Sequence, residues 1–467
     1  YRFIQNKRTV IYKLINSSIP LYIQLYNQIK EKIEKELAAG TKLPSIRKMA
    51  QDYQISKNTV ESAYSQLFAE GYIQSRPQSG YFVSDDIEHY LDPKETDEEI
   101  CLPDISQPLY DFYPAHLHND HFPNKLWSKL HNKVMNNQIN FGGYPNKQGE
   151  LPLRIEISKY LSHNRGVHCH PEQIIVSSGF ADCMFIVASL LKSFTSKLAI
   201  EFPGYNVVKQ VFKQFDYSIE NIPINSNGIS LKDLKASQCK LLYVTPSHQY
   251  PTGVTIPISN RFKLIQWATQ NNAYIIEDDY DSELSYNNRP IPALQGINNN
   301  NCVIYSGTFS KSLSPALRIN YLVLPTNLVK KYQNIFSFPF SGVPIDTQKT
   351  LELFIKEGYW EKHIRKIRTL NRKKHDIMKH NLLLYLDQYI SILREGSGLS
   401  IVIVPTVKLD WEELNKKAEH KKIKLHYIHD DSTSTIQAIC MGFGGFLQQE
   451  IPLAIKEFSE IFLKEIK

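Results

Sequence analysis

Lys311 lies in a run of small and hydroxyl-bearing residues that could place its amine in a binding site. The run is Ser306-Gly307-Thr308-Phe309-Ser310-Lys311, and Arg318 follows seven residues later. Asp278-Asp279-Tyr280 adds carboxylates, and Ser178-Gly179-Phe180-Ala181 adds backbone N–H groups at a predicted helix start, where a phosphate can bind. Pyridoxal 5′-phosphate needs this set of groups: an amine for a Schiff base, a carboxylate for the pyridine nitrogen, and cationic and hydroxyl groups for the phosphate. Lys311 alone would be an ordinary solvated lysine, so the prediction depends on the joint pattern.

Each of these polar segments follows a short apolar run that is typical of a buried β-strand. The runs are Ile174–Val176, Leu198–Ile200, Leu241–Val244, Tyr274–Ile276 and Val303–Tyr305. Helical patterns alternate with them, which predicts an α/β fold whose mainly parallel sheet binds ligands at the carboxyl ends of its strands. Tyr205 follows the second run and offers an aromatic face. No GxGxxG follows a strand, so a nicotinamide site is not supported.

The charge is distributed unevenly along the 467 residues, whose formal net charge is +7. Residues 1–84 contain twelve Lys/Arg and six Asp/Glu, whereas residues 85–104 contain nine acidic residues and one Lys. A basic head followed by an acidic, proline-containing strip indicates a nucleic-acid surface and a solvated linker. The expected organisation is a DNA-binding domain at 1–84, an acidic linker at 85–111 and a larger domain at 112–467.

The basic head contains the pattern of a winged helix-turn-helix. Leu21–Ala38 has one apolar face, and two shorter helices follow, capped by Ser45 and by Ser56. The segments Tyr72–Ser75 and Gly80–Val83 are predicted to form two strands around a polar tip. A pair of capped helices is by itself more often plain packing than a DNA reader. The order of three helices and a basic hairpin within one basic segment is much more specific.

These residues resemble the GntR family of bacterial regulators. The matching motifs are Leu43-Pro44-Ser45-x-Arg47, Ser56-Lys57-Asn58-Thr59-Val60, Glu70-Gly71-Tyr72 and Ser79-Gly80-Tyr81-Phe82-Val83. The resemblance implies phosphate or base contacts with double-stranded operator DNA from Arg47, Ser56, Lys57, Asn58 and Thr59. It also implies that Gln78 and Ser79 lie in the wing near the minor groove.

The larger domain resembles the fold-type I aminotransferase superfamily, which consists of a large domain with a small C-terminal subdomain. The motifs are Val244-Thr245-Pro246-Ser247-His248-Gln249-Tyr250-Pro251-Thr252-Gly253, Ile276-Glu277-Asp278-Asp279-Tyr280-Asp281-Ser282-Glu283 and Gly307-Thr308-Phe309-Ser310-Lys311-Ser312-Leu313. Together with the GntR-like head, they are similar to the MocR/GabR subfamily of regulators.

This second resemblance implies a role for each matching residue. Lys311 would form the internal aldimine, and Asp278 would bind the ring nitrogen. Tyr280 would form a hydrogen bond with the ring hydroxyl, and Tyr205 would stack on the ring. The residues around the phosphate would be Gly179, Phe180, Ala181, Thr308, Ser310 and Arg318. The superfamily pairs subunits across its active sites, so we expect a homodimer, domain-swapped and head-to-tail, in which Tyr144 reaches the partner's site.

The chain departs from the subfamily pattern where an amino-acid carboxylate would bind. GabR-type regulators carry an arginine two residues after the stacking tyrosine and another in a late strand-turn motif; here the residues are Val207 and Gly445. An arginine fork is the usual way to hold a carboxylate. We therefore hypothesise that pyridoxal phosphate is itself the signal, as in the PdxR-like subgroup that controls pyridoxal-phosphate synthesis, with little or no transaminase turnover. The alternatives are an active aminotransferase and a regulator that responds to an amino acid or amine.

The remaining features indicate no further site. The six cysteines are scattered without a CxxC pair, which is typical of reduced thiols in a cytoplasmic protein. Two histidine groups, around His118 and around Cys169, lack a convincing ligand geometry, so no metal is expected. No apolar run is long enough to span a bilayer, and the first residues lack the apolar stretch of a signal peptide.

Overall fold

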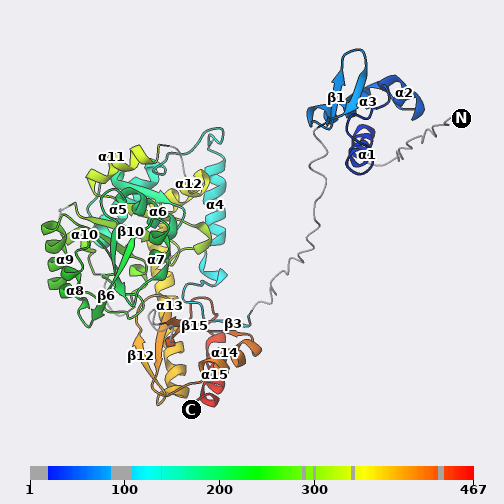
Figure 1. The fold of residues 1–467 in the computed structure, drawn as a ribbon. Helices are drawn as coiled ribbons and strands as arrows, with labels where there is room; N and C mark the ends of the chain where they lie inside the picture. Colours follow the sequence, from blue (N-terminus) through cyan, green and yellow to red (C-terminus); the bar gives the residue numbers. More distant parts are fainter. Residues whose placement is uncertain are drawn as a thin grey trace. The chain divides into compact units, whose positions relative to one another are not determined.

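The structure is a computed structural model that describes residues 19–85, 108–137, 139–286, 291–297, 301–337, 342–429 and 436–467. The chain divides into two compact units, Tyr1–Ile105 and Ser106–Lys467 (Figure 1). Residues 86–107, which hold most of the expected acidic linker and Cys101, lie outside the described residues.

The first unit consists of three helices and a two-stranded hairpin. Its elements are α1 (Leu21–Lys35), α2 (Ile46–Asp52), α3 (Lys57–Ala69), β1 (Ile73–Arg76) and β2 (Gly80–Val83). The helices form where the sequence predicts them, although α1 ends at Lys35, three residues before the end of the expected helix. Their apolar faces meet in one core that is built mainly from Leu25, Ile29, Met49, Val60, Tyr64 and Leu67. The strands pair antiparallel, with Arg76 opposite Gly80.

The second unit is built around an eight-stranded mixed sheet. Its strands are β4 (Ile174–Ser177), β5 (Lys197–Phe202), β6 (Ser218–Asn225), β7 (Gly228–Ile229), β8 (Leu241–Val244), β9 (Tyr274–Asp279), β10 (Val303–Thr308) and β11 (Asn320–Val323). The spatial order is β4-β11-β10-β9-β8-β5-β6-β7. The five strands from β10 to β6 are parallel, and β11 runs against both β10 and β4. All five β-runs expected from the sequence are strands of this sheet.

Helices cover both faces of the sheet, because successive strand residues point to opposite sides. On one face, strand residues such as Ile276 and Ile304 pack against α6 (Phe180–Leu191), α7 (Asn206–Lys213) and α11 (Thr326–Ile335). On the other face, neighbours such as Ile275 and Val303 pack against α8 (Leu231–Ala236), α9 (Ile258–Gln270) and α10 (Leu294–Ile297). The helix α12 (Ile345–Lys356) contacts both α4 (Asn124–Met135) and α5 (Leu151–Arg165). This arrangement is the α/β architecture that the sequence predicts.

The C-terminal part of the unit forms a smaller antiparallel sheet. Its strands are β12 (Ile390–Arg394), β13 (Ser400–Pro405), β16 (Ile436–Gly442) and β15 (His426–His429), in that spatial order. The helices α13 (Tyr359–Leu386), α14 (Trp411–His420) and α15 (Glu450–Lys464) belong to this part of the chain (Figure 1). The short strand β3 (Tyr110–Asp111) pairs with β14 (Ile423–Lys424), so the start of the unit is attached to its C-terminal subdomain.

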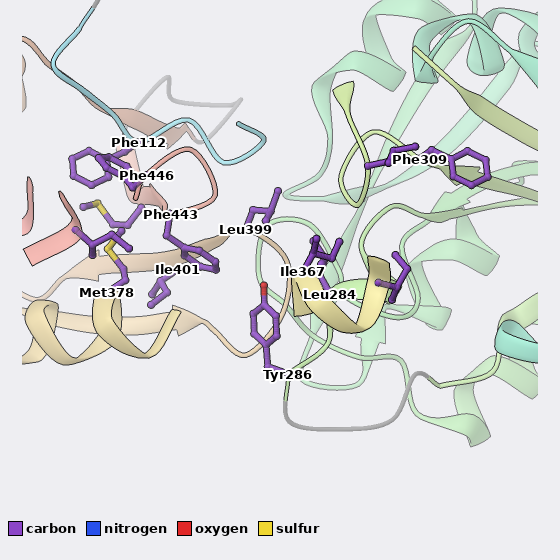
Figure 2. Close-up of a cluster of buried hydrophobic side chains, with 14 of the residues drawn as sticks. Phe112, Leu284, Tyr286, Phe309, Ile367, Met378, Leu399, Ile401, Phe443 and Phe446 are labelled. Atoms are coloured by element: carbon purple, nitrogen blue, oxygen red, sulfur yellow. The ribbon is translucent and has the colours of Figure 1, made fainter. Parts of the chain in front are cut away.

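One hydrophobic cluster runs from the small sheet into the large subdomain (Figure 2). Leu399 and Tyr286 lie between the side chains around Phe443 and those around Leu284 and Ile367 in Figure 2. The Tyr286 hydroxyl donates a hydrogen bond to the carbonyl of Gly398, at the turn that precedes β13. This shared core holds the β12–β13 turn against the segment that follows β9.

Within the described ranges, no helix combines the length and the apolar character needed to cross a membrane. The five cysteines in the described part of the chain form no disulfide; they are Cys169, Cys183, Cys239, Cys302 and Cys440.

Candidate functional site

The polar segments predicted from the sequence meet at one edge of the large sheet. Asp278 lies near the end of β9 and pairs in register with Ser306 on the parallel strand β10. Lys311 follows the end of β10, Tyr205 follows β5, and Gly179 follows β4. These strands run in the same direction, so the segments that follow them meet at the carboxyl edge of the sheet. Parallel pairing therefore brings together residues that are more than a hundred positions apart.

The side chains surround a cavity of about 760 Å³, within the range of about 300–1,000 Å³ that small-molecule sites occupy. Eight of the ten cofactor-binding residues predicted from the sequence line it: Phe180, Tyr205, Asp278, Tyr280, Thr308, Ser310, Lys311 and Arg318. Gly179 and Ala181 do not line it and lie at the start of α6 beside it. The sequence thus selects a group of residues that the fold brings to one cavity.

Lys311 extends its amine to a segment that sequence reasoning missed. Its Nζ donates to the carbonyl oxygen of Pro114 at 3.4 Å, and residues 113–116 line the cavity. The pKa of Lys311 is lowered to about 8, mainly by burial and also by the positive charge of Arg394, while the negative charge of Asp281 acts in the opposite direction. Near neutral pH, the neutral and therefore nucleophilic fraction of this amine is larger than that of a solvated lysine.

Asp278 is a buried carboxylate with one phenolic partner in the structure. The hydroxyl of Tyr243, on β8, donates to its Oδ2 at 2.6 Å. Burial raises the pKa of Asp278 to about 7, against the lowering effect of the Tyr243 hydrogen bond. A cationic ring nitrogen placed beside this carboxylate would favour its ionised form and would offset the cost of burying the charge.

Arg318 and the start of α6 form a cationic corner of the cavity. Gly179 has a φ of +105°, and a Cβ added there would lie 2.1 Å from Nη2 of Arg318. Only a glycine therefore lets the guanidinium approach the N-terminus of α6 so closely. Asp182 accepts hydrogen bonds from Ser177 Oγ at 2.6 Å and from the Ser178 backbone at 2.9 Å, which fixes the loop before the helix. The corner suits a phosphate because it combines a fixed cation with the N–H groups of a helix start.

Tyrosines form the aromatic part of the cavity. The Tyr205 ring lies 5.5 Å from Phe180 and 5.5 Å from Tyr250, measured between ring centroids. Burial raises the pKa of Tyr205 to about 12. The Tyr280 hydroxyl donates to the carbonyl oxygen of His248 at 3.0 Å. All these hydroxyls are neutral at physiological pH, so they can donate or accept without adding charge to the site.

A second set of charged groups, which sequence reasoning missed, lines the same cavity. Asp281 accepts a hydrogen bond from Arg394 Nη2 at 2.7 Å and lies 3.0 Å from Nδ1 of His248. Arg394 is the last residue of β12 and lies 83 positions after Lys311 in the chain. A charged residue at the end of a mainly apolar run, just before the Gly396-Ser397-Gly398 turn, is the signal that could have pointed to Arg394. Val207, one of the two positions where a carboxylate-binding arginine is absent, also lines the cavity.

The predicted DNA-contacting residues lie on two surfaces of the first unit. Arg47 is exposed on α2; Lys57 and Asn58 are exposed in the first turn of α3 and Thr59 is half-buried there. Ser56 caps this helix, because its Oγ accepts from the Thr59 backbone at 3.1 Å. Gln78 and Ser79 are exposed at the tip of the hairpin, and Gln78 has a positive φ of 59°. These residues are accessible to a macromolecular partner.

Comparison with known proteins gives matches along nearly the whole chain. The family described as bacterial regulatory proteins, gntR family, matches residues 21–83, and aminotransferase class I and II matches residues 116–369. The uncharacterized HTH-type transcriptional regulator YdeL of Bacillus subtilis is 38% identical over 452 residues, which cover 94% of this chain and 96% of YdeL. The HTH-type pyridoxine biosynthesis transcriptional regulator PdxR of Corynebacterium glutamicum is 29% identical over 367 residues, 78% of this chain and 79% of PdxR.

Solved structures share the architecture of the second unit. A kynurenine aminotransferase of Pyrococcus horikoshii matches with a TM-score of 0.69 and 21% identity, over 78% of this chain and 92% of that chain. This likeness shows that residues after the acidic strip have the aminotransferase fold.

Proposed function

The chain belongs to the MocR/GabR subfamily of GntR-family transcription regulators, and on that premise we propose that it binds operator DNA and senses pyridoxal 5′-phosphate at Lys311. The observation that carries the proposal is the meeting of a depressed-pKa amine, a buried carboxylate and a cationic corner in one cavity. These three groups match the aldehyde, the ring nitrogen and the phosphate of that cofactor.

The donor set fits the cofactor residue by residue. Lys311 would hold its aldehyde covalently, Asp278 would pair with the ring nitrogen, and Tyr280 would contact the ring hydroxyl. Tyr205 would stack on the ring. The groups around the phosphate would be Arg318, Thr308, Ser310 and the first N–H groups of α6, from Gly179 to Ala181. When bound, the cofactor supplies an electrophilic carbon that captures amines.

The cofactor itself is proposed to be the signal. Val207 places an apolar side chain where GabR-type regulators carry an arginine, and Gly445 removes the second one. The relative named as a regulator of pyridoxine biosynthesis is consistent with a vitamer signal. For the vitamer to act as a switch, the protein must bind it with different affinities in its DNA-bound and free arrangements. Efficient transaminase turnover is not expected of such a regulator.

Operator recognition would come from the winged helix. Arg47 and Lys57 would contact phosphates, while Ser56, Asn58 and Thr59 would lie at the amino end of the recognition helix, close to base edges. Gln78 and Ser79, at the tip of the wing, would approach the minor groove. Neutralising phosphates releases counterions, so the affinity would fall steeply with salt.

A homodimer would present two such heads on repeated half-sites. The loop between α4 and α5 exposes two aromatic side chains, with Tyr144 89% and Phe141 58% accessible. Exposed aromatic side chains of this size are typical of interfaces. In a domain-swapped, head-to-tail dimer, Tyr144 would reach the cavity of the partner subunit.

The test combines absorbance with DNA binding. The purified protein saturated with the vitamer should absorb in the visible range, and borohydride should trap the vitamer on Lys311; Lys311→Ala should lose both signals. Titration of the vitamer, without any amino acid, against binding to the DNA upstream of the protein's own gene should shift the affinity in the wild type and leave Lys311→Ala unaffected. A colourless wild-type protein, or a DNA complex indifferent to the vitamer, contradicts the proposal. Release of keto-acid product at ordinary transaminase rates would instead identify a working enzyme.

A further inference from the structure

A row of basic side chains covers the exposed side of α13 between Glu361 and Asp376. No acidic residue lies between these two positions. We call the exposed basic residues of this stretch the α13 basic face; they are Lys362, Arg365, Lys366, Arg372 and Lys373. Their positive charges are gathered on one side of about three helical turns. Such a concentration of one sign of charge attracts an anionic partner.

The α13 basic face has no counter-charge of its own in the described part of the chain. None of its five members forms an ion pair with a carboxylate among the described residues. Exposed lysines elsewhere in the second unit are paired: Lys416 lies 2.6 Å from Glu412, and Lys421 lies 2.5 Å from Glu457. Members of the face that are three or four positions apart repel each other, because they lie side by side on the helix. An external anion would relieve this repulsion.

The other side of α13 fixes the helix to the second unit. Ile367 packs in the hydrophobic cluster that runs from the small sheet into the large subdomain. Arg368 Nε donates to the carbonyl oxygen of Glu283 at 3.0 Å, and Arg372 Nη2 donates to that of Tyr286 at 2.6 Å. The backbone that presents the basic face is therefore held in place before any partner arrives. Preorganisation of this kind lowers the entropic cost of binding.

The length and composition of the α13 basic face fit the backbone of double-stranded DNA. From Lys362 to Lys373 the helix rises about 17 Å, at about 1.5 Å per residue. This length matches about five phosphates of one DNA strand, which are about 3.4 Å apart along the axis. Along α13, which the structure describes from end to end, the only exposed large apolar side chain is Leu384. A helix that lies on a membrane would instead expose an apolar face.

We propose that the α13 basic face binds the phosphate backbone of operator DNA, outside the bases and phosphates that the winged helix contacts. The proposal rests on the proposed function, since that function brings the protein to DNA. The second unit thus makes a DNA contact of its own. This contact positions the protein without reading sequence, because lysine and arginine side chains on phosphates do not distinguish bases. Each neutralised phosphate releases counterions, so the contact weakens as salt increases.

The experiment measures the affinity of the full-length protein for DNA by fluorescence anisotropy between about 50 and 200 mM salt. One duplex carries the DNA upstream of the protein's own gene, and the other is a scrambled duplex of equal length. The test variant combines Lys362→Gln, Lys366→Gln and Lys373→Gln. Loss of three phosphate contacts should lower the slope of log affinity against log salt concentration by about 2.7, at about 0.9 per phosphate. The fall in affinity across this salt range should then be about 40-fold smaller than in the wild type, on both duplexes.

Two control variants separate a local contact from a change in net charge. Lys416→Gln, Lys421→Gln and Lys456→Gln together remove the same charge from other exposed positions of the second unit, so they should leave the slope unchanged. Arginine at the three test positions keeps the positive charges and should keep the wild-type slope.

Circular dichroism establishes that the glutamine variant is folded. Lys366→Gln alone, which should lower the slope by about 0.9, covers the case in which the triple variant does not fold. An unchanged slope in the folded variants, or an equal fall in the control at the other lysines, overturns the proposal. A wild type that binds neither duplex would instead refute the proposed operator binding itself, so the two failures are distinguishable.

Discussion

The low pKa of Lys311 predicts how fast the protein captures the vitamer at different pH. Capture requires the neutral amine, and burial lowers the pKa of this lysine from 10.5 to about 8. At pH 7.5, about 24% of an amine with that pKa is neutral, against about 0.1% of a solvated lysine, which is a difference of roughly 200-fold. The second-order rate of capture should therefore rise about tenfold per pH unit below pH 8 and level off above it.

Stopped-flow absorbance after mixing vitamer-free protein with pyridoxal phosphate measures this rate between pH 6.5 and 9.5, a range chosen to bracket the pKa of about 8. A free lysine derivative serves as the reference, and its rate should still be rising at the upper end of that range. Borohydride trapping and peptide mapping then identify the modified residue. Lys374 is the matched comparison: burial also lowers its pKa to about 8, but it donates to the carbonyl of Gly444 and does not line the cavity. A rate that climbs through pH 9.5 without levelling, or modification at Lys374, would refute the reasoning.

Three further predictions concern the phosphate corner and the head. Gly179→Ala should weaken vitamer binding at least about tenfold, because the new Cβ would lie 2.1 Å from Arg318 and the backbone φ of +105° is strained for alanine. Fluorescence titration measures this affinity, and an unchanged value argues against a phosphate at the start of α6. Ser56→Ala should lower the unfolding free energy of the head by about 1 kcal/mol, because α3 loses the capping hydrogen bond from the Thr59 backbone N–H to Ser56. Urea denaturation followed by circular dichroism measures this loss, and Ser79→Ala in the exposed wing is the control. Lys57→Ala should reduce the slope of log affinity against log salt concentration by about one for any DNA sequence. Fluorescence anisotropy measures this slope, and a slope identical to that of the wild type would show that Lys57 contacts no phosphate.

Local patterns account for what could be predicted from the sequence. Ser45 and Ser56 cap their helices as expected because a cap depends on residues three positions apart. The strand runs and the segments after them were found because burial on both faces of a sheet leaves a continuous apolar run. The positions of Lys311, Asp278 and Tyr205 in one cavity followed from a general property of parallel sheets, whose strand ends share one edge.

Tertiary structure alone decided which residues complete the cavity. Pro114 reaches Lys311 from a segment almost two hundred positions earlier, and Arg394 reaches Asp281 from the separate C-terminal sheet. The sequence marks Arg394 only as a charged residue at the end of a mainly apolar run. No local pattern predicts the partners in either contact, because each depends on how two subdomains pack through a shared core and on glycines that allow close approach. The sequence by itself therefore determined the fold class, the helix caps and the strand-end residues. The partners and charge environment of those residues were set by long-range packing, which brings distant segments of the chain into contact.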